Sequence, residues 1–381
     1  MLKRFWLWLG RLLGRLLLAL TVLGLAGWAI AALHFHLTHR GPVSSEEIIA
    51  PTEAADTQAI IEDAIAVVEQ HRDNTRVLRD AHAKAHGCVR AEVSVRADLE
   101  PALRRQGVFS EPGKTWQAWV RLSNGNAYPQ FDRIRDARGM AIKLLDVPGQ
   151  KLTGNPRHAG EQDFVMFNHP VFFVRDVAEY RSNFAAQARG QKVLAFFPGW
   201  DPRQWELRHL LIALQTLAPA PQSPVATTYS SVAPYKLGPH NIKYRVIPTP
   251  ERCPDYRLPE QNRDLPNFLR SALYQQLSLD RAPACFALQV QRQNPQHYMP
   301  IEDTSIEWDE AIAPFETVAD IRLPPQDFDS PEQNLACDNL AFNPWHALPE
   351  HRPIGGINRL RKAVYEAISS YRLERNGALA P

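Results

Sequence analysis

Three short clusters within residues 119–180 constrain the fold more than any other part of the chain. They read V-R-L-S-N at 120–124, R-D-A-R-G-M-A-I-K at 135–143 and N-H-P-V-F-F-V-R-D at 168–176. Each is a short apolar run with charged side chains set inside it, which is typical of a strand with one packed face. An arginine on such a face needs an anionic partner, because an unpaired buried charge is costly. The clusters therefore predict strands that surround a buried anion.

Size and charge narrow the class of protein. A chain of 381 residues with 45% hydrophobic side chains can bury a large core in one domain or two. The net charge of +2 argues against nucleic acid as a partner, because that affinity comes from clustered Lys and Arg. The four cysteines contain no C-x-x-C pair, which argues against a structural zinc site. They are either free or paired in one or two disulfides.

The N-terminal segment has the composition of a membrane span. Residues 16–33 carry no charged side chain and follow Lys3, Arg4, Arg11 and Arg15. The length is just enough for a transmembrane helix, and the preceding basic residues predict a cytoplasmic N-terminus. We expect a single-pass anchor with the rest of the chain on the periplasmic or extracytoplasmic side. A cleaved signal peptide is the alternative, since Ala29-Ile30-Ala31 offers small residues at a suitable spacing.

The chain divides into three parts. Residues 1–40 hold the cytoplasmic N-terminus and the anchor or signal, 41–57 form a polar linker, and 58–381 form one folded domain. Strand-like and helical patterns alternate with proline-rich connections in that domain, and no phosphate-binding glycine loop follows any strand-like run. Together these patterns predict an α+β protein in which helices wrap a central antiparallel sheet that closes as a barrel.

The predicted elements of the folded domain can be placed by periodicity. They are helices at 57–71 and 357–373, helical segments within 177–217 that include Trp200, strands at 91–95, 241–247 and 285–291, and connections over 314–353.

Two motifs carry side chains suited to redox or proton-transfer chemistry. In R-D-A-H-A-K at 79–84, His82 has a pKa near neutrality and suits proton transfer, although a lone histidine in a loop is usually an ordinary surface residue. His86 is a nearby competitor for that role. In R-K-A-V-Y at 361–365, helical spacing sets Arg361 over Tyr365, where a cation favours the ionised phenol. The simpler interpretation of this pair is a helix-surface contact.

Together these motifs resemble the monofunctional catalase family. The family patterns are R-x-x-H-A-K, V-R-F-S, R-D-P-R-G-F-A-x-K-F, N-T-P-x-F-F-x-R-D and R-x-x-x-Y, and L-A-F-N-P at 340–344 is similar to the family's L-A-F-D-P. The resemblance covers about residues 76–375 and lacks the family's extra C-terminal region. It implies a catalase-type β-barrel wrapped by helices and a bound haem b.

The resemblance also implies residue roles. His82, Ser123 and Asn168 match catalytic positions on the distal side of the haem, and Tyr365 matches the proximal iron ligand. The implied haem-binding residues are Arg79, Arg121, Phe172, Tyr180, Arg361 and Tyr365. Phe167 stands where the family has the asparagine that contacts peroxide, so either Asn168 or Phe167 is expected to face the pocket.

Two classes of function follow from the resemblance. The first is a haem enzyme that reacts with hydrogen peroxide or with organic hydroperoxides, by catalase, peroxidase or isomerase chemistry. The membrane anchor and an apolar pocket favour organic hydroperoxides. The alternative is a non-catalytic haem or lipid carrier built on the same barrel, which would bind haem without a peroxide-dependent spectral change.

Overall fold

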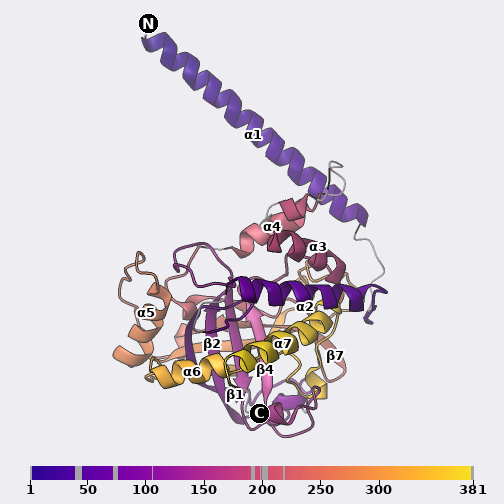
Figure 1. Ribbon diagram of the computed structural model, residues 1–381, viewed down its shortest axis with the longest axis vertical. Helices are drawn as coiled ribbons and strands as arrows, with labels where there is room; N and C mark the ends of the chain where they lie inside the picture. The colour runs from indigo at the N-terminus through magenta and orange to yellow at the C-terminus, as the bar shows by residue number, and fades with distance from the viewer. Residues whose placement is uncertain are drawn as a thin grey trace.

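The computed structural model describes residues 2–38, 45–71, 76–104, 106–189, 194–197, 199, 205–217 and 219–378. Within these residues, nine strands form one antiparallel sheet at the centre of the molecule (Figure 1). They are β1 (Ala85–Val95), β2 (Thr115–Asn124), β3 (Arg138–Leu144), β4 (Gln162–Phe167), β5 (Tyr229–Ser230), β6 (Tyr235–Leu237), β7 (His240–Pro248), β8 (Ala284–Arg292) and β9 (Phe315–Leu323).

The sheet closes on itself. Its strand order is β5-β4-β3-β2-β1-β9-β8-β7, and β5 also pairs with β7 through Tyr229 and Val246, so that eight strands form a barrel. The short strand β6 pairs with β7 outside this closure. Closure removes the unpaired strand edges that an open sheet would expose. The predicted antiparallel barrel is therefore confirmed.

The two faces of β2 and β3 have different roles because successive side chains on a strand point to opposite sides. Val120 and Leu122 of β2 belong to the barrel core, together with Met140 of β3. Arg121 and Ser123 lie on the other face. That outer face is covered by helices, which creates a second, smaller apolar layer beside the barrel.

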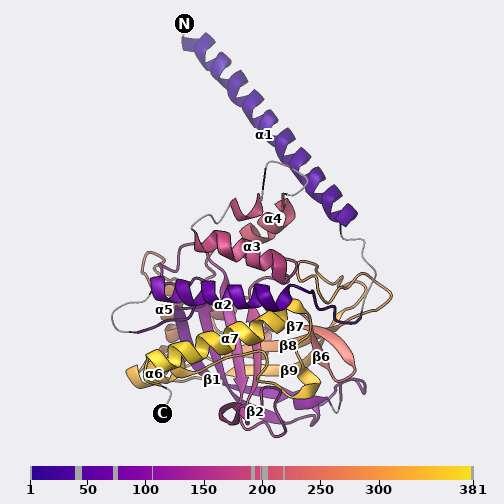
Figure 2. The same cartoon turned by 45° about the vertical axis from the view of Figure 1, so that its right-hand side comes forward.

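Helices pack on this outer face (Figures 1 and 2). They are α2 (Glu53–Gln70), α3 (Val177–Ala188), α4 (Leu207–Thr216) and α7 (Gly356–Arg375), while α5 (Phe268–Tyr274) and α6 (Pro331–Asn339) lie at the barrel's side. Helix α2 contacts both α3 and α7. Ile60 and Ala64 of α2 meet Leu360 and Val364 of α7 in one buried cluster, which joins the first and last helices of the domain.

Helix α1 (Leu2–Thr38) projects away from the rest of the protein and contacts α4 (Figures 1 and 2). Its stretch Trp8–Ile30 is long and apolar enough to cross a membrane, and a signal sequence would have the same properties. This stretch begins earlier than the predicted span at 16–33.

Some predicted elements differ from the structure. Residues 168–176 are a loop between β4 and α3 rather than a strand, because the prolyl residue Pro170 and the bends around it interrupt pairing. The proline-rich region 314–353, interpreted as connections, contains β9 and α6. Helix α2 begins at Glu53 rather than at residue 57. Glu53 is held there by Arg359 of α7, a contact that no local pattern reveals. Trp200 lies outside the described residues.

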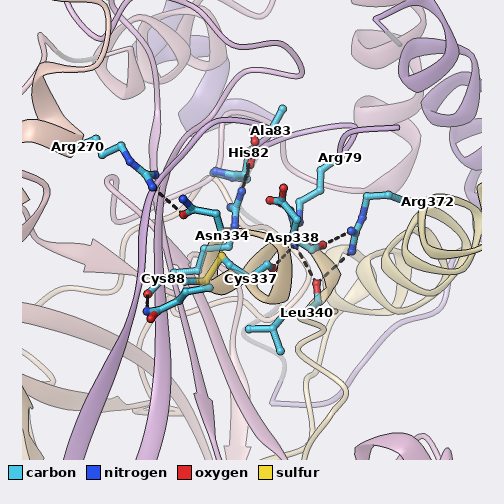
Figure 3. The surroundings of a disulfide bond; sticks show 12 residues. Arg79, His82, Ala83, Cys88, Arg270, Asn334, Cys337, Asp338, Leu340 and Arg372 are labelled. Carbon is cyan, nitrogen blue, oxygen red and sulfur yellow. Dashed lines mark hydrogen bonds and ion pairs between the residues drawn. A yellow bond between two sulfur atoms is a disulfide. The ribbon is translucent and has the colours of Figure 1, made fainter. Parts of the chain in front are cut away.

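Both possible disulfides form, which answers the question that cysteine spacing left open. Cys253 pairs with Cys285, and Cys88 of β1 pairs with Cys337 of α6. Figure 3 shows the second bond beside the end of α6, whose backbone carbonyls face Arg79. The disulfide therefore fixes α6 against the barrel at the edge of the outer-face cavity described below.

A buried histidine attaches α4 to its neighbours. His209 is 2% exposed, and its Nδ1 lies 2.6 Å from Glu179 of α3 and 2.7 Å from Glu206. Burial alone would lower the pKa of His209, but contacts with the two carboxylates outweigh it and raise the pKa to about 9. Arg208 adds a hydrogen bond to the Ser305 carbonyl at 2.7 Å. The position of α4 thus depends on a protonated imidazole.

This ion-paired histidine predicts a pH-dependent attachment of α4. The pKa of His209 is about 9 in the fold and ~6.5 in an unfolded chain, so the stabilisation is complete below pH ~6.5 and is lost as the pH rises through about 9. Hydrogen exchange, corrected for its intrinsic pH dependence, should accelerate in α4 between pH 8 and 10. The variant His209→Gln should lack this step. An identical pH profile in both proteins would contradict the assignment.

Candidate active site

A cavity of about 730 Å³ lies between the outer face of β2, β3 and β4 and the helices that cover it. Its walls come from α2, α3, α4 and α7, from the segment before β1 and from the loop between β2 and β3. This volume is within the range of pockets that hold cofactors and other small molecules. Of the sequence-predicted site residues, the following line it: Arg79, His82, Arg121, Ser123, Phe172, Tyr180, Arg361 and Tyr365.

His82 is held by backbone contacts just before β1. Its φ of 58° lies in the left-handed region, which non-glycine residues seldom adopt, and its backbone N–H donates to the Gly125 carbonyl at 2.9 Å. The imidazole Nδ1 lies 3.0 Å from the Asn124 carbonyl and 3.2 Å from the Ser123 hydroxyl. A carbonyl only accepts, so Nδ1 carries the proton and Nε2 keeps the lone pair.

The protonation state of His82 suits a base. Burial, assisted by the positive charge of Arg121, lowers the pKa of His82 to about 4. The ring is therefore neutral near pH 7, and Nε2 can accept a proton. Ser123 lies where the resemblance implies it, beside Nδ1 of this ring.

Gly139 of β3 makes room for the imidazole. A Cβ at this position would lie 2.5 Å from His82 Nδ1 and 3.0 Å from Ser123 Oγ. Real Cβ atoms essentially never make contacts shorter than 3.0 Å, so either the ring or the strand would have to move. The glycine in R-D-A-R-G is thus required by the histidine that packs over it.

Three arginines gather at one end of the cavity. Arg121 is 4% exposed and its Nη2 donates to the His82 carbonyl at 2.7 Å, while Arg79 and Arg372 both donate to the Leu340 carbonyl (Figure 3). Arg79 also lies 3.9 Å from Asp338. Burial lowers the pKa of all three guanidinium groups, that of Arg372 to about 9.

This cluster has unused hydrogen-bonding capacity. The Nε atoms of Arg121 and Arg372 are buried without a hydrogen-bond partner. The carboxylates close to the three cations are those of Asp80 and Asp338. A buried cation without sufficient compensation is costly, so an anionic ligand group would be stabilised here. An anion of the kind expected from the sequence would therefore be stabilised at this end of the cavity.

Tyr365 and Arg361 extend the site onto α7. The Arg361 guanidinium carbon lies 5.5 Å from the centre of the Tyr365 ring, and Arg361 Nη1 donates to the Tyr235 hydroxyl at 3.1 Å. Burial would lower the pKa of Arg361, but Tyr235, Tyr365 and Tyr244 outweigh it and raise the pKa above its ordinary value. Arg361 therefore remains a cation beside the Tyr365 phenol, and the simpler interpretation of a helix-surface pair is wrong.

Aromatic rings form a further wall. Phe167 and Tyr180 each contact Phe172, at 5.9 and 5.6 Å between ring centres, and all three line the cavity. Asn168 does not line it. Its Oδ1 accepts from the Arg138 backbone N–H at 2.6 Å, so the side chain holds the loop after β4 to β3. The structure places Phe167, not Asn168, at the cavity.

His86 is excluded as a competitor by its position. It is buried outside the cavity and contacts Asn124 Oδ1 at 2.9 Å through Nε2. Asn124 in turn donates to Asp132, which pairs with Lys84 at 2.6 Å. His86 therefore belongs to a structural polar network, and its removal is expected to destabilise the fold rather than to leave it unaffected.

Sequence reasoning missed two charged cavity residues that lie near the arginine cluster, Arg372 and Asp80. Arg372 lies on the face of α7 that carries Tyr365, seven residues away, so helical periodicity was the signal that could have found it. Asp80 stands within the R-D-A-H-A-K motif and lines the cavity. Burial raises the pKa of Asp80 to about 6, against the opposing effect of Arg79.

Comparisons with known proteins agree with this geometry. The catalase family profile matches residues 39–198. Proteins described as "Catalase easC" from Arthroderma benhamiae and Trichophyton verrucosum are 29% identical over 126 residues, which is 32% of this chain. That match spans only 24% of the length of these relatives.

Solved catalase structures share the fold. A fungal catalase superimposes with a TM-score of 0.62 at 18% identity, covering 88% of this chain and 65% of its own. Catalase A from Saccharomyces cerevisiae gives 0.60 at 16% identity, covering 88% and 67%. At such identities the likeness concerns the barrel and its helices. In fold, family profile and sequence, the chain is thus similar to catalases.

The close approach of Gly139 and His82 predicts a coupling that stability measurements can detect. Gly139→Ala should lower the free energy of unfolding by ~1–3 kcal/mol, the usual cost of overpacking. In a His82→Ala background the same change should cost much less, because the two nearest atoms that it meets, Nδ1 and Cε1 of His82, are gone and only Ser123 Oγ at 3.0 Å remains. Gly160→Ala is the matched control, since its Cβ would meet only Asp146 atoms at 3.8 Å. Equal costs in both backgrounds would refute the contact.

Proposed function

We propose that this protein is a haem-dependent enzyme that processes peroxides. The observation that carries the proposal is that one cavity is lined by a neutral histidine, a tyrosine beside an arginine, and a cluster of under-compensated arginines. Members of the catalase family generally bind haem, and these groups suit a haem enzyme. Tyr365 would bind the haem iron, the arginines would bind the haem propionates, and His82 would face the peroxide.

The residues present fit haem b on chemical grounds. The buried Nε atoms of Arg121 and Arg372 are free to donate to carboxylates, and Arg79 adds a third cation. Tyr365 supplies a phenol oxygen, and the Arg361 guanidinium lies beside its ring. When bound, the haem would supply a ferric centre with the redox chemistry that the side chains lack.

His82 would accept a proton from the peroxide and then return it. With Nδ1–H bonded to the Asn124 carbonyl, Nε2 accepts the proton of the O–H group. The low pKa of His82 then favours return of that proton to the other peroxide oxygen. Ser123 keeps the ring oriented during both transfers. This role is that of a positioned acid–base group, usually worth ~10²–10⁴ in rate.

Organic hydroperoxides are the preferred substrate class in this proposal. Phe167 lines the cavity at the position where the catalase family has an asparagine. Phe172 and Phe173 continue this apolar wall. Hydrogen peroxide gains nothing from such a wall, whereas a hydroperoxide with an apolar body buries surface against it. Hydrogen peroxide disproportionation is the second candidate, and oxygen release separates the two.

We also propose that α1 anchors the protein to a membrane with the haem domain on the extracytoplasmic side. The apolar stretch Trp8–Ile30 and the basic residues near its start support this orientation. The two disulfides support it too, because disulfides persist in oxidising compartments and are rare in the cytosol.

Substitutions at the two key residues should separate cofactor retention from catalysis. Tyr365→Phe removes the proposed iron ligand, so haem should be lost or held weakly, as measured by the Soret absorbance after gel filtration. His82→Ala keeps that ligand and the arginines, so haem should stay bound while peroxide turnover falls by ~10²–10⁴. The exposed histidine variant His297→Ala is the control. Unchanged turnover in His82→Ala with haem bound would favour the carrier alternative.

A third variant tests the substrate preference. Phe167→Asn should raise turnover of hydrogen peroxide relative to that of a bulky organic hydroperoxide, because an amide replaces an apolar wall beside the peroxide. Initial rates with the two substrates give the ratio. Leu335→Asn, on the exposed surface of α6, should keep the wild-type ratio. No change in Phe167→Asn would show that this wall does not select the substrate.

A further inference from the structure

The mouth of the cavity is rimmed by apolar side chains that are exposed to solvent. Tyr128 and Ile134, from the loop at 125–137, are 36% and 47% exposed, and Leu214 and Leu217, from α4 and its end, are 54% and 40% exposed. All four also line the cavity. Single exposed apolar residues are ordinary, but four that meet from two separate elements around one opening form a patch.

The patch continues beyond the cavity. Phe131 on the loop and Leu211 on α4 are 42% and 46% exposed and do not line the cavity. The loop also carries Arg133 and Arg135, both exposed, on either side of Ile134, and Arg133 pairs with Asp264 at 3.1 Å. Apolar residues interleaved with arginine are typical of surfaces that lie at the interface of a bilayer with anionic lipids.

The patch also lies next to the membrane helix. Helix α4 contacts α1, and Figures 1 and 2 both show α4 between α1 and the barrel. The side chains of the α1 stretch Trp8–Ile30 are largely exposed, as expected of a segment that is covered by lipid. A bilayer around α1 would therefore lie on the side of the domain that carries the patch.

We infer that the cavity mouth docks on the bilayer and admits the acyl chain of a membrane lipid hydroperoxide directly from the lipid phase. This inference rests on the proposed function for the chemistry and on the patch alone for the docking. The apolar rim would receive the chain, and the aromatic wall at Phe167 and Phe172 would guide its peroxide group toward His82. Entry is a binding step, so no bond forms or breaks before the peroxide reaches the histidine.

The position of α4 gives this entrance its shape. Leu210, Ala213 and Leu214 line the cavity from one side of α4, while His209 holds another side to Glu179 and Glu206. The helix is thus attached to the domain by polar contacts and is free to present its apolar side chains. Helix α4 is held by ion pairs and exposes leucines. Such a helix is suited to an environment in which lipid covers those leucines.

The docking can be measured without reference to activity. Full-length protein with a nitroxide label at Ile134→Cys or Leu214→Cys is reconstituted in nanodiscs of phosphatidylcholine and phosphatidylglycerol, and power saturation compares access of oxygen and of a water-soluble nickel complex. Both labels should be more accessible to oxygen and less to nickel than a label at Leu335→Cys on α6. Nickel access equal to that of the control would overturn the proposal. Spin–spin broadening between two copies would also overturn it, in favour of a protein contact.

Kinetics then test the entry of lipid. Phe131→Glu leaves the cavity lining intact but charges the patch. Its turnover of phosphatidylcholine hydroperoxide in nanodiscs should fall at least tenfold relative to its turnover of hydrogen peroxide, whereas Leu335→Glu should keep the wild-type ratio. An unchanged ratio in Phe131→Glu would reject lipid entry. Absence of turnover with every peroxide, with labels 134 and 214 still in lipid, would reject the proposed function and retain the docking surface.

Discussion

The buried arginines beside the cavity are the interaction on which the rest of the site depends. Arg79, Arg121 and Arg372 are taken out of water, and such charges are tolerated only with hydrogen bonds or counter-charges. The end of α6 supplies part of this compensation through the Leu340 carbonyl and Asp338. The Cys88–Cys337 disulfide keeps α6 in place, so a covalent bond outside the cavity maintains the electrostatics inside it.

The strand that carries Arg121 links this charge cluster to the histidine. The two-residue period of β2 directs Val120 and Leu122 into the barrel and leaves Arg121 and Ser123 on the outer face. From there the arginine bonds the His82 carbonyl and the serine meets the His82 ring. One strand therefore serves the core with alternate residues and the site with the others.

Much of the barrel and of the site could be predicted from the sequence because the elements that form them show a regular spacing of apolar and charged residues. Alternation indicated β2, and helical spacing indicated the Arg361–Tyr365 pair. The strand β9 could not be found in this way, because its register with β1 and β8 is set by partners more than 20 residues distant and prolines flank it. Asn168 was assigned to the site by its place in a motif, but its side chain serves the neighbouring strand instead. A motif gives the order of residues, whereas only packing decides which of two adjacent side chains faces a cavity.

The separation of charged and apolar side chains in the cavity also determines how a bound molecule is oriented. Arginines lie at one end, and the apolar rim of Ile134, Leu214 and Leu217 lies at the mouth, so an occupant with charged and apolar parts has one favourable orientation. A haem would direct its carboxylates toward the arginines, because turning them to the rim would leave both the carboxylates and the guanidinium groups unpaired. The apolar mouth then remains for a second, uncharged molecule. In the proposed function, the segregation of charge that would retain the cofactor would therefore also select an apolar substrate, on the side of the domain that carries α1.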